Sequence, residues 1–92
     1  MSLSDKAWKH IRERHPEVSN YRSIIEDIVM KPEAIFKGHR GVKKAIRRLD
    51  NTHLGPLHLV VVYSEHKGRK AIITAYFTSD TKRIKGEEIW KA

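Results

Sequence analysis

Two prolines divide this chain into stretches of different hydrophobic period. Apolar residues recur at helical spacing before Pro16 and again before Pro32, whereas strand-like runs follow Pro32. Because proline disfavours helical geometry in the residue that precedes it, we expect helices to end at His15 and at Lys31. The pattern therefore predicts two helices first and strands afterwards.

The first predicted helix covers about residues 4–14. Ser4 is a good N-cap, and the apolar residues after it are spaced to form one buried stripe: Leu3, Ala7, Trp8 and Ile11. The second helix is expected to begin near Ser19 or Asn20, with Tyr21, Ile24, Ile25 and Ile28 on one stripe.

The strand signals cover residues 34–37, 57–63 and 70–78. Residues 43–50 are helix-permissive by propensity but lie between strand signals, and we favour a strand there. A loop of four or five residues at 65–68 would join the last two strands as a hairpin, and residues 51–56 have turn chemistry. Residues 79–92 are expected to add a short strand or to pack Ile89 and Trp90 on the core. The chain is predicted to be one α+β domain, residues 1–92, with the helices on one face of an antiparallel sheet.

The charge balance narrows the classes of partner. The chain has 92 residues, 19 Lys and Arg against 11 Asp and Glu, and a formal net charge of +8. This excess favours a polyanion, most simply a nucleic acid, although a solvated surface or a face for an acidic protein would give the same count. The absence of cysteine excludes disulfides and thiolate metal sites. We expect no membrane span and a cytoplasmic location.

RNA can be cut without a metal ion, because its own 2′-hydroxyl is the nucleophile. The enzyme must then supply an acid, a base and cations, which His, Tyr, Lys and Arg side chains provide. On a helical wheel His15 falls beside Trp8 and Ile11 at the edge of the buried stripe, and His10 and Arg14 lie on its other edge. His15 is accordingly a candidate acid or base, and the alternative is a histidine that packs or caps the helix.

The strand over residues 70–78 carries two hydroxyl groups at alternate positions. Alternation predicts Ile72, Thr74 and Tyr76 on one face, where the hydroxyls could bind phosphate, and the alternative is that both were chosen for β propensity.

A basic cluster precedes that strand in the sequence. Its members are Lys43, Lys44, Arg47 and Arg48. In a strand Arg47 and Arg48 point to opposite faces, and we prefer Arg48 for the site. His58 is predicted at an exposed position of the sheet. No histidine or carboxylate spacing suits a metal, so no metal or other cofactor is expected.

Several short motifs resemble a known group of nucleases. They are Trp8 to Val18 with His15-Pro16, Tyr21 with Ile24 and Ile28, Lys31 to Ile35, Leu59 to Val62, and Ile73 to Tyr76. The pattern is similar to the phage-associated members of the barnase, EndoU, colicin E5/D and RelE group. The resemblance implies two helices on a four-stranded antiparallel sheet and metal-independent ribonuclease activity, often in toxin or effector proteins of mobile elements. By position it implies that His15, Thr74, Tyr76 and a basic residue within 44–48 form the site. The strand aromatic usual in the group is missing here, and the choice of acid and base stays open.

These observations lead to one reading and two alternatives. The first is a metal-independent endoribonuclease that produces a 2′,3′-cyclic phosphate, with His15, Arg48, Lys44, Thr74 and Tyr76 as catalytic residues and His10, Arg14, Lys43, Arg47 and His58 as RNA contacts. The alternatives are a non-catalytic module that binds RNA or a ribosome, and a toxin-like domain whose main partner is an acidic antitoxin or immunity protein.

Overall fold

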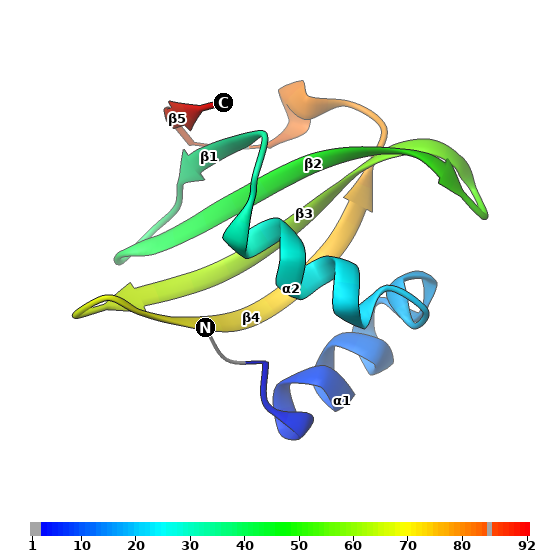
Figure 1. Ribbon diagram of the computed structural model, residues 1–92, viewed down its shortest axis with the longest axis horizontal. Coiled ribbons are helices and arrows are strands. Elements are labelled where there is room, and N and C mark those ends of the chain that lie inside the picture. Colours follow the sequence, from blue (N-terminus) through cyan, green and yellow to red (C-terminus); the bar gives the residue numbers. More distant parts are fainter. Residues whose placement is uncertain (1–2, 85) are drawn as a thin grey trace.

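The computed structural model describes residues 3–84 and 86–92 (Figure 1). The elements follow in this order: α1 (Asp5–Arg14), the 3₁₀ turn η1 (Pro16–Val18), α2 (Arg22–Met30), β1 (Ala34–Lys37), β2 (Val42–Thr52), β3 (Gly55–His66), β4 (Arg69–Thr78), the 3₁₀ turn η2 (Thr81–Arg83) and β5 (Glu88–Lys91). Residues 43–50 lie in β2, so the interpretation of this ambiguous run as a strand is confirmed.

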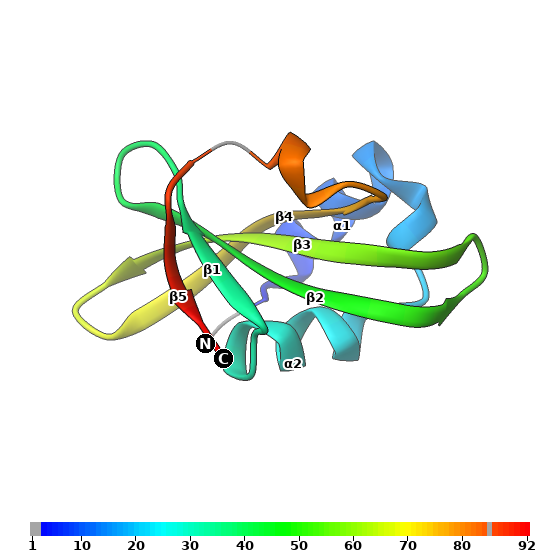
Figure 2. The ribbon, with the colours of Figure 1, turned by 90° about the horizontal axis from the view of Figure 1, so that it is seen from above.

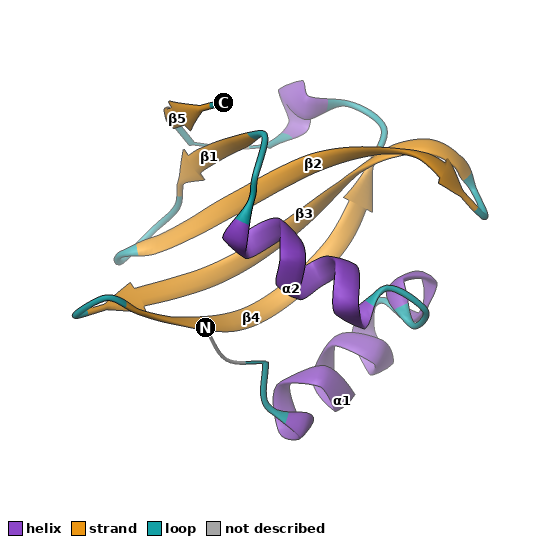
Figure 3. Ribbon diagram, in the orientation of Figure 1, coloured by secondary structure: helices purple, strands orange, loops and turns teal. Residues whose placement is uncertain are grey.

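The strands form one antiparallel sheet in the order β4-β3-β2-β1-β5. Both α-helices lie on the same side of it (Figures 1 and 3), so the prediction of an α+β fold with helices on one sheet face is confirmed. The described residues give five strands, and the expected number of four was wrong. The additional strand, β5, is the short strand expected within residues 79–92. The alternative, that Ile89 and Trp90 pack on the core, was wrong, because they are 45% and 46% exposed.

The main core lies between the helices and the sheet. Ile11 of α1 and Ile25 and Ile28 of α2 are fully buried there, against Leu59 and Val61 of β3. These helical residues belong to the predicted apolar stripes, and burial of such stripes supplies most of the stability of an amphipathic helix.

The second face of the sheet, opposite the helices, is partly covered by the chain between β4 and β5. These strands lie at opposite edges, so the connection must cross the sheet, and Figure 2 shows it passing over this face. We call its described residues, 79–84, 86 and 87, the crossover segment. Ile84 packs there against Ala34, Ile46 and Val60 as a second apolar cluster. Gly86 has φ +119°, and a side chain at this position would overlap the carbonyl oxygen of Lys37, so glycine is needed where the segment passes β1.

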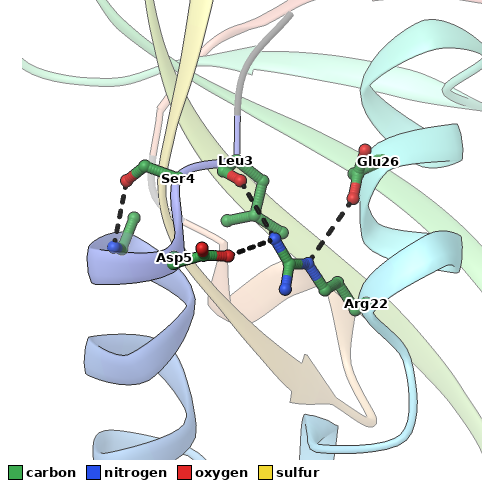
Figure 4. Close-up of polar contacts among 6 residues, drawn as sticks. Leu3, Ser4, Asp5, Arg22 and Glu26 are labelled. Atoms are coloured by element: carbon green, nitrogen blue, oxygen red, sulfur yellow. Dashed lines mark hydrogen bonds and ion pairs between the residues drawn. The ribbon is translucent and has the colours of Figure 1, made fainter.

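Arg22 joins the beginning of α1 to α2 (Figure 4). Its guanidinium donates to the Leu3 carbonyl at 3.3 Å, pairs with Asp5 at 3.0 Å and lies 3.8 Å from the Glu26 carboxylate. The Ser4 hydroxyl accepts a hydrogen bond from the amide of Ala7 at 3.1 Å, as expected for the predicted N-cap.

The second helix begins later than expected. Tyr21 is its N-cap residue, and α2 starts at Arg22. Ser19 instead closes η1, where its hydroxyl donates to the Pro16 carbonyl at 2.6 Å. A good capping residue was thus used by the turn that precedes the helix.

The alternation predicted for residues 72–78 fails at one position. The register between β3 and β4 shifts because Val62 faces Thr74 whereas Tyr63 faces Ile72. The extra residue, Ile73, is 42% exposed, and Ile72 turns into the helix-side core. The assignment of Ile72 to the same face as Thr74 and Tyr76 was wrong.

Both hairpins are tighter than predicted. Strand β3 runs to His66 and β4 starts at Arg69, so two residues remain in the turn instead of four or five. Lys67 and Gly68 have φ of 51° and 78°, as a type I′ turn requires. Likewise β2 extends to Thr52 and β3 begins at Gly55 within the predicted turn 51–56, and the Thr52 hydroxyl donates to the Gly55 carbonyl.

We expect Ile28→Ala to lower the free energy of unfolding by about 2–5 kcal/mol, because it removes atoms from a fully buried site and leaves a cavity. Ile73→Ala, at 42% exposure, should cost less than about 1 kcal/mol. Urea denaturation of both variants measures the difference. Equal losses would show that the helix-side core does not carry the stability.

Candidate functional site

Five of the predicted site residues share the second face. The strand register places Lys44 and Thr74 in one cross-strand row on either side of Val62, and places Arg48, His58 and Thr78 in another. Tyr76 lies between these rows, opposite Val60. The residues brought to this face are Lys44, Arg48, His58, Thr74 and Tyr76. Thr78 shares it and was not predicted, although it continues the alternation of Thr74 and Tyr76.

His15 reaches the edge of the same face from the end of α1. Its amide donates to the Ile11 carbonyl at 2.7 Å, which closes the last helical turn. Pro16 then directs the chain into η1, which contacts the edge strand β4. The imidazole centroid lies 5.8 Å from that of the Tyr76 ring, and the planes are inclined by 37°. The helix end and the middle of β4 therefore meet as one side-chain pair.

Glu17 is the functional candidate that the sequence reasoning missed. Its carboxylate lies 3.4 Å from Nδ1 of His15, and the two side chains are 31% and 33% exposed. The 3₁₀ turn brings it there, because the Val18 amide donates to the His15 carbonyl and folds residue 17 back over the helix end. The sequence signal for Glu17 was its position directly after His15-Pro16. Only the 3₁₀ turn brings its carboxylate to the imidazole.

Tyr76 has an apolar setting. It packs against the cluster of Ala34, Ile46, Val60 and Ile84, and this burial raises the pKa of its phenol above 10.0. The phenol stays protonated at neutral pH and can donate a hydrogen bond beside the imidazole. Thr74 lies two residues away on the same face of β4.

This arrangement has the parts of an acid–base site. A carboxylate 3.4 Å from Nδ1 can help to orient the imidazole. The neighbouring Tyr76 carries a protonated phenol, a group that can stabilise developing charge on an oxygen atom. Both groups are partly exposed to solvent, so a ligand can reach them.

The predicted cations of β2 lie farther away. Strand β3 separates β2 from β4, so two strand spacings, about 10 Å, lie between the backbones that carry Arg48 and Tyr76. Arg48 pairs with Asp50 at 2.9 Å, and both are exposed. Lys44 lines a pocket at another end of the face with Lys37, Gly38, His39, Gly86 and Glu87. Neither cation is on a strand next to β4, which carries Tyr76.

Two predicted RNA contacts of β2 lie on the helix side of the sheet. Arg47 pairs with Asp27 at 2.8 Å and donates to the carbonyls of Asp27 and Lys31, which fixes the end of α2 to β2. Lys43 donates to Glu65 at 2.6 Å, and this contact raises the pKa of Lys43 and lowers that of Glu65. Both side chains therefore hold the fold together on the face away from His15.

The two predicted RNA contacts of α1, His10 and Arg14, are exposed on the helix surface. Of the other histidines, His53 is exposed but stacks on Tyr21 at 5.9 Å, and its Nδ1 lies 3.2 Å from the phenol oxygen.

Comparisons of the chain with protein-family models, with curated proteins and with solved structures find no match. Within residues 3–84 and 86–92, no group of three His, Asp or Glu side chains is placed to hold a metal ion. None of the helices in the same part of the chain has the length and apolar character needed to cross a membrane.

We expect the Tyr76 phenol to ionise above the value of about 10 for a free tyrosine, because burial disfavours the phenolate. The tyrosinate absorbance of Tyr76→Phe, subtracted from that of the unsubstituted protein during an alkaline titration, isolates this group. A difference curve with its midpoint at or below that of N-acetyltyrosinamide would contradict the buried setting of the phenol.

Proposed function

We propose that this protein is a metal-independent endoribonuclease of the toxin or effector type, which cleaves RNA by transesterification. The observation that carries the proposal is that His15 lies beside both the Glu17 carboxylate and the Tyr76 ring. The net charge of +8 and the resemblance of the His15-Pro16 and Thr74-Ala75-Tyr76 motifs to the barnase and RelE group add support.

The proposed reaction uses the 2′-hydroxyl of the RNA itself. His15 Nε2 takes the hydroxyl proton, the 2′-oxygen bonds to phosphorus, and the bond from phosphorus to the 5′-oxygen breaks. The leaving 5′-oxygen takes up a proton from water, the His15 imidazolium returns its proton to the solvent, and a 2′,3′-cyclic phosphate remains. Tyr76 and Thr74 would donate hydrogen bonds to the phosphate oxygens as charge builds up on them.

The surrounding basic residues would hold the flanking phosphates. Lys44, Arg48 and His58 share the second face, and His10 and Arg14 lie on α1. Arg48 must exchange its Asp50 partner for a phosphate, which is feasible because exposed ion pairs contribute little free energy. Lys43 and Arg47 are left out of this proposal because their ion pairs stabilise the other face.

One observation favours a non-catalytic alternative. The cations of β2 stand away from the His15–Tyr76 pair, so the charge that develops on a phosphorane there would lack a guanidinium or ammonium group from this strand. A module that binds RNA, or docks on a ribosome, needs the basic residues without this alignment.

We expect His15→Ala to lower the rate of RNA cleavage by roughly 10²- to 10⁴-fold, the usual effect of losing a general acid or base. RNA affinity should change little, because the imidazole is one contact among many basic groups. Cleavage of a labelled oligonucleotide in EDTA, with identification of the product end, measures both the loss and the chemistry.

His66→Ala is the matched control, since His66 is exposed at the far end of β3 and should retain full activity. A requirement for Mg²⁺, or a product without a cyclic phosphate, would exclude the proposed mechanism. Binding of RNA without any cleavage by the unsubstituted protein would identify the non-catalytic module.

RNA binding is expected to weaken by at least about 10-fold between about 50 and 200 mM salt, because each phosphate contact releases counterions. Fluorescence anisotropy of a labelled oligonucleotide at several salt concentrations gives the slope. A flat dependence would be incompatible with RNA as the partner.

A further inference from the structure

Exposed apolar side chains gather around one pocket on the helix side of the sheet. Among the described residues, the large apolar side chains with the greatest exposure include Met30 at 62%, Ile89 at 45% and Trp90 at 46%. All three line a cavity of about 660 Å³. Clustering of this kind on a small domain marks an interaction site more often than chance exposure does.

The pocket exists because α2 ends before it covers the whole sheet. The helix stops at Met30, and Pro32 leads the chain into β1, so the faces of β1 and β5 beyond the helix end stay uncovered. The register of β1 and β5 shifts between Ile35 and Phe36, which leaves Ile89 as an extra residue beside Trp90. This bulge allows both neighbouring side chains to line the same pocket.

The rim of the pocket is basic. Lys31, Lys43 and Lys70 line it, and its lining residues include no carboxylate. Glu65 is nearby, pairs with Lys43 and also interacts with the charge of Lys70, so three lysines face one carboxylate and an excess of positive charge remains. An occupant with apolar side chains and carboxylates would complement both features.

An open backbone edge lies next to the pocket. β5 is the last strand of the sheet, and within the described chain it pairs with β1 alone. Its four residues are exposed, so the outer N–H and C=O groups can bind an added strand.

We propose that this surface binds an extended acidic segment of another protein. The segment adds to the outer edge of β5, places alternate apolar side chains between Met30 and Trp90, and turns its carboxylates toward the lysine-lined pocket. A second copy of this chain fits poorly, because it would bring two proteins of charge +8 together at lysine-lined pockets. RNA fits less well than a peptide because Val29, Pro32, Ile35 and Ile89 form an aliphatic wall.

The proposal does not depend on ribonuclease activity. Trp90 and Ile35 lie on the helix side, near the β5 edge, whereas His15 and Tyr76 meet at the β4 edge. A protein that cleaves no RNA can still bind the segment, and a failure to bind leaves the His15 site unaffected.

The test uses a fluorescein-labelled peptide in which glutamate alternates with valine, titrated with the full chain by anisotropy. We expect saturable binding and a shift of the Trp90 indole N–H signal in ¹⁵N spectra. Met30→Asp should weaken binding by about 10-fold or more, as for a central contact of an interface. Leu54→Asp is the matched control: Leu54 is 58% exposed, lies at the β2–β3 turn and should bind like the unsubstituted protein.

Two further peptides separate the contribution of the lysine rim from that of the β5 backbone edge. Lysine in place of glutamate should abolish binding if the lysine rim selects carboxylates, and N-methylation of alternate residues should abolish it if the β5 edge pairs with the backbone. No binding up to about 1 mM, equal binding to Met30→Asp, or equal binding of the lysine peptide would overturn the proposal. Displacement of the Trp90 signal by an RNA oligonucleotide, and not by the acidic peptide, would assign the surface to nucleic acid instead.

Discussion

Burial of strand β3 on both faces is the constraint on which the rest of the structure depends. Leu59 and Val61 pack under the helices, and Val60 packs under Ile84 of the crossover segment, all with no exposed surface. A slip of one residue would exchange the two sets between cores of different shape, so the register of the neighbouring strands is fixed strongly. This register sets the spacing of Thr74, Tyr76 and Thr78 and brings the helix end to them.

The sequence predicted the parts of the fold that follow from hydrophobic period. Both helices, their ends before Pro16 and at Lys31, and strands β1, β3 and β4 correspond to clear patterns, whereas β2 was assigned because it lies between strand signals. The errors lie where a tertiary contact decides. Ile73 bulges because the strand pairing shifts, and the sheet of the described residues has five strands instead of four because Gly86 lets the chain pass β1 and β5 pair with it. Neither contact can be predicted from the spacing of apolar residues along the sequence.

Prediction of the site depended on the alternation of side chains along strands. Alternation predicts the sheet face on which a side chain lies, but not its distance from side chains on other strands. It separated Arg47 from Arg48 and put Thr74 with Tyr76, and the structure has these residues on those faces. It could not show that Arg48 would pair with Asp50 or that β3 would stand between β2 and β4. Glu17 was missed because the pairing of residues two apart depends on a 3₁₀ turn.

The positive charge serves different purposes on the two sides of the sheet. On the helix side, Arg22, Lys43 and Arg47 each have a carboxylate partner, and their ion pairs join α1 to α2 and β2 to α2 and β3. Each of these pairs contributes no net charge, so the excess of +8 comes from cations outside them. On the second face and on α1, residues such as His10, Arg14 and His58 have no carboxylate partner within the described chain. In the proposed functions, Arg14, next to His15 in the chain, is a cation available to RNA, whereas Lys31 and Lys70 line an apolar pocket and suit the proposed peptide. One basic chain can in this way present two surfaces that bind ligands of different chemical class.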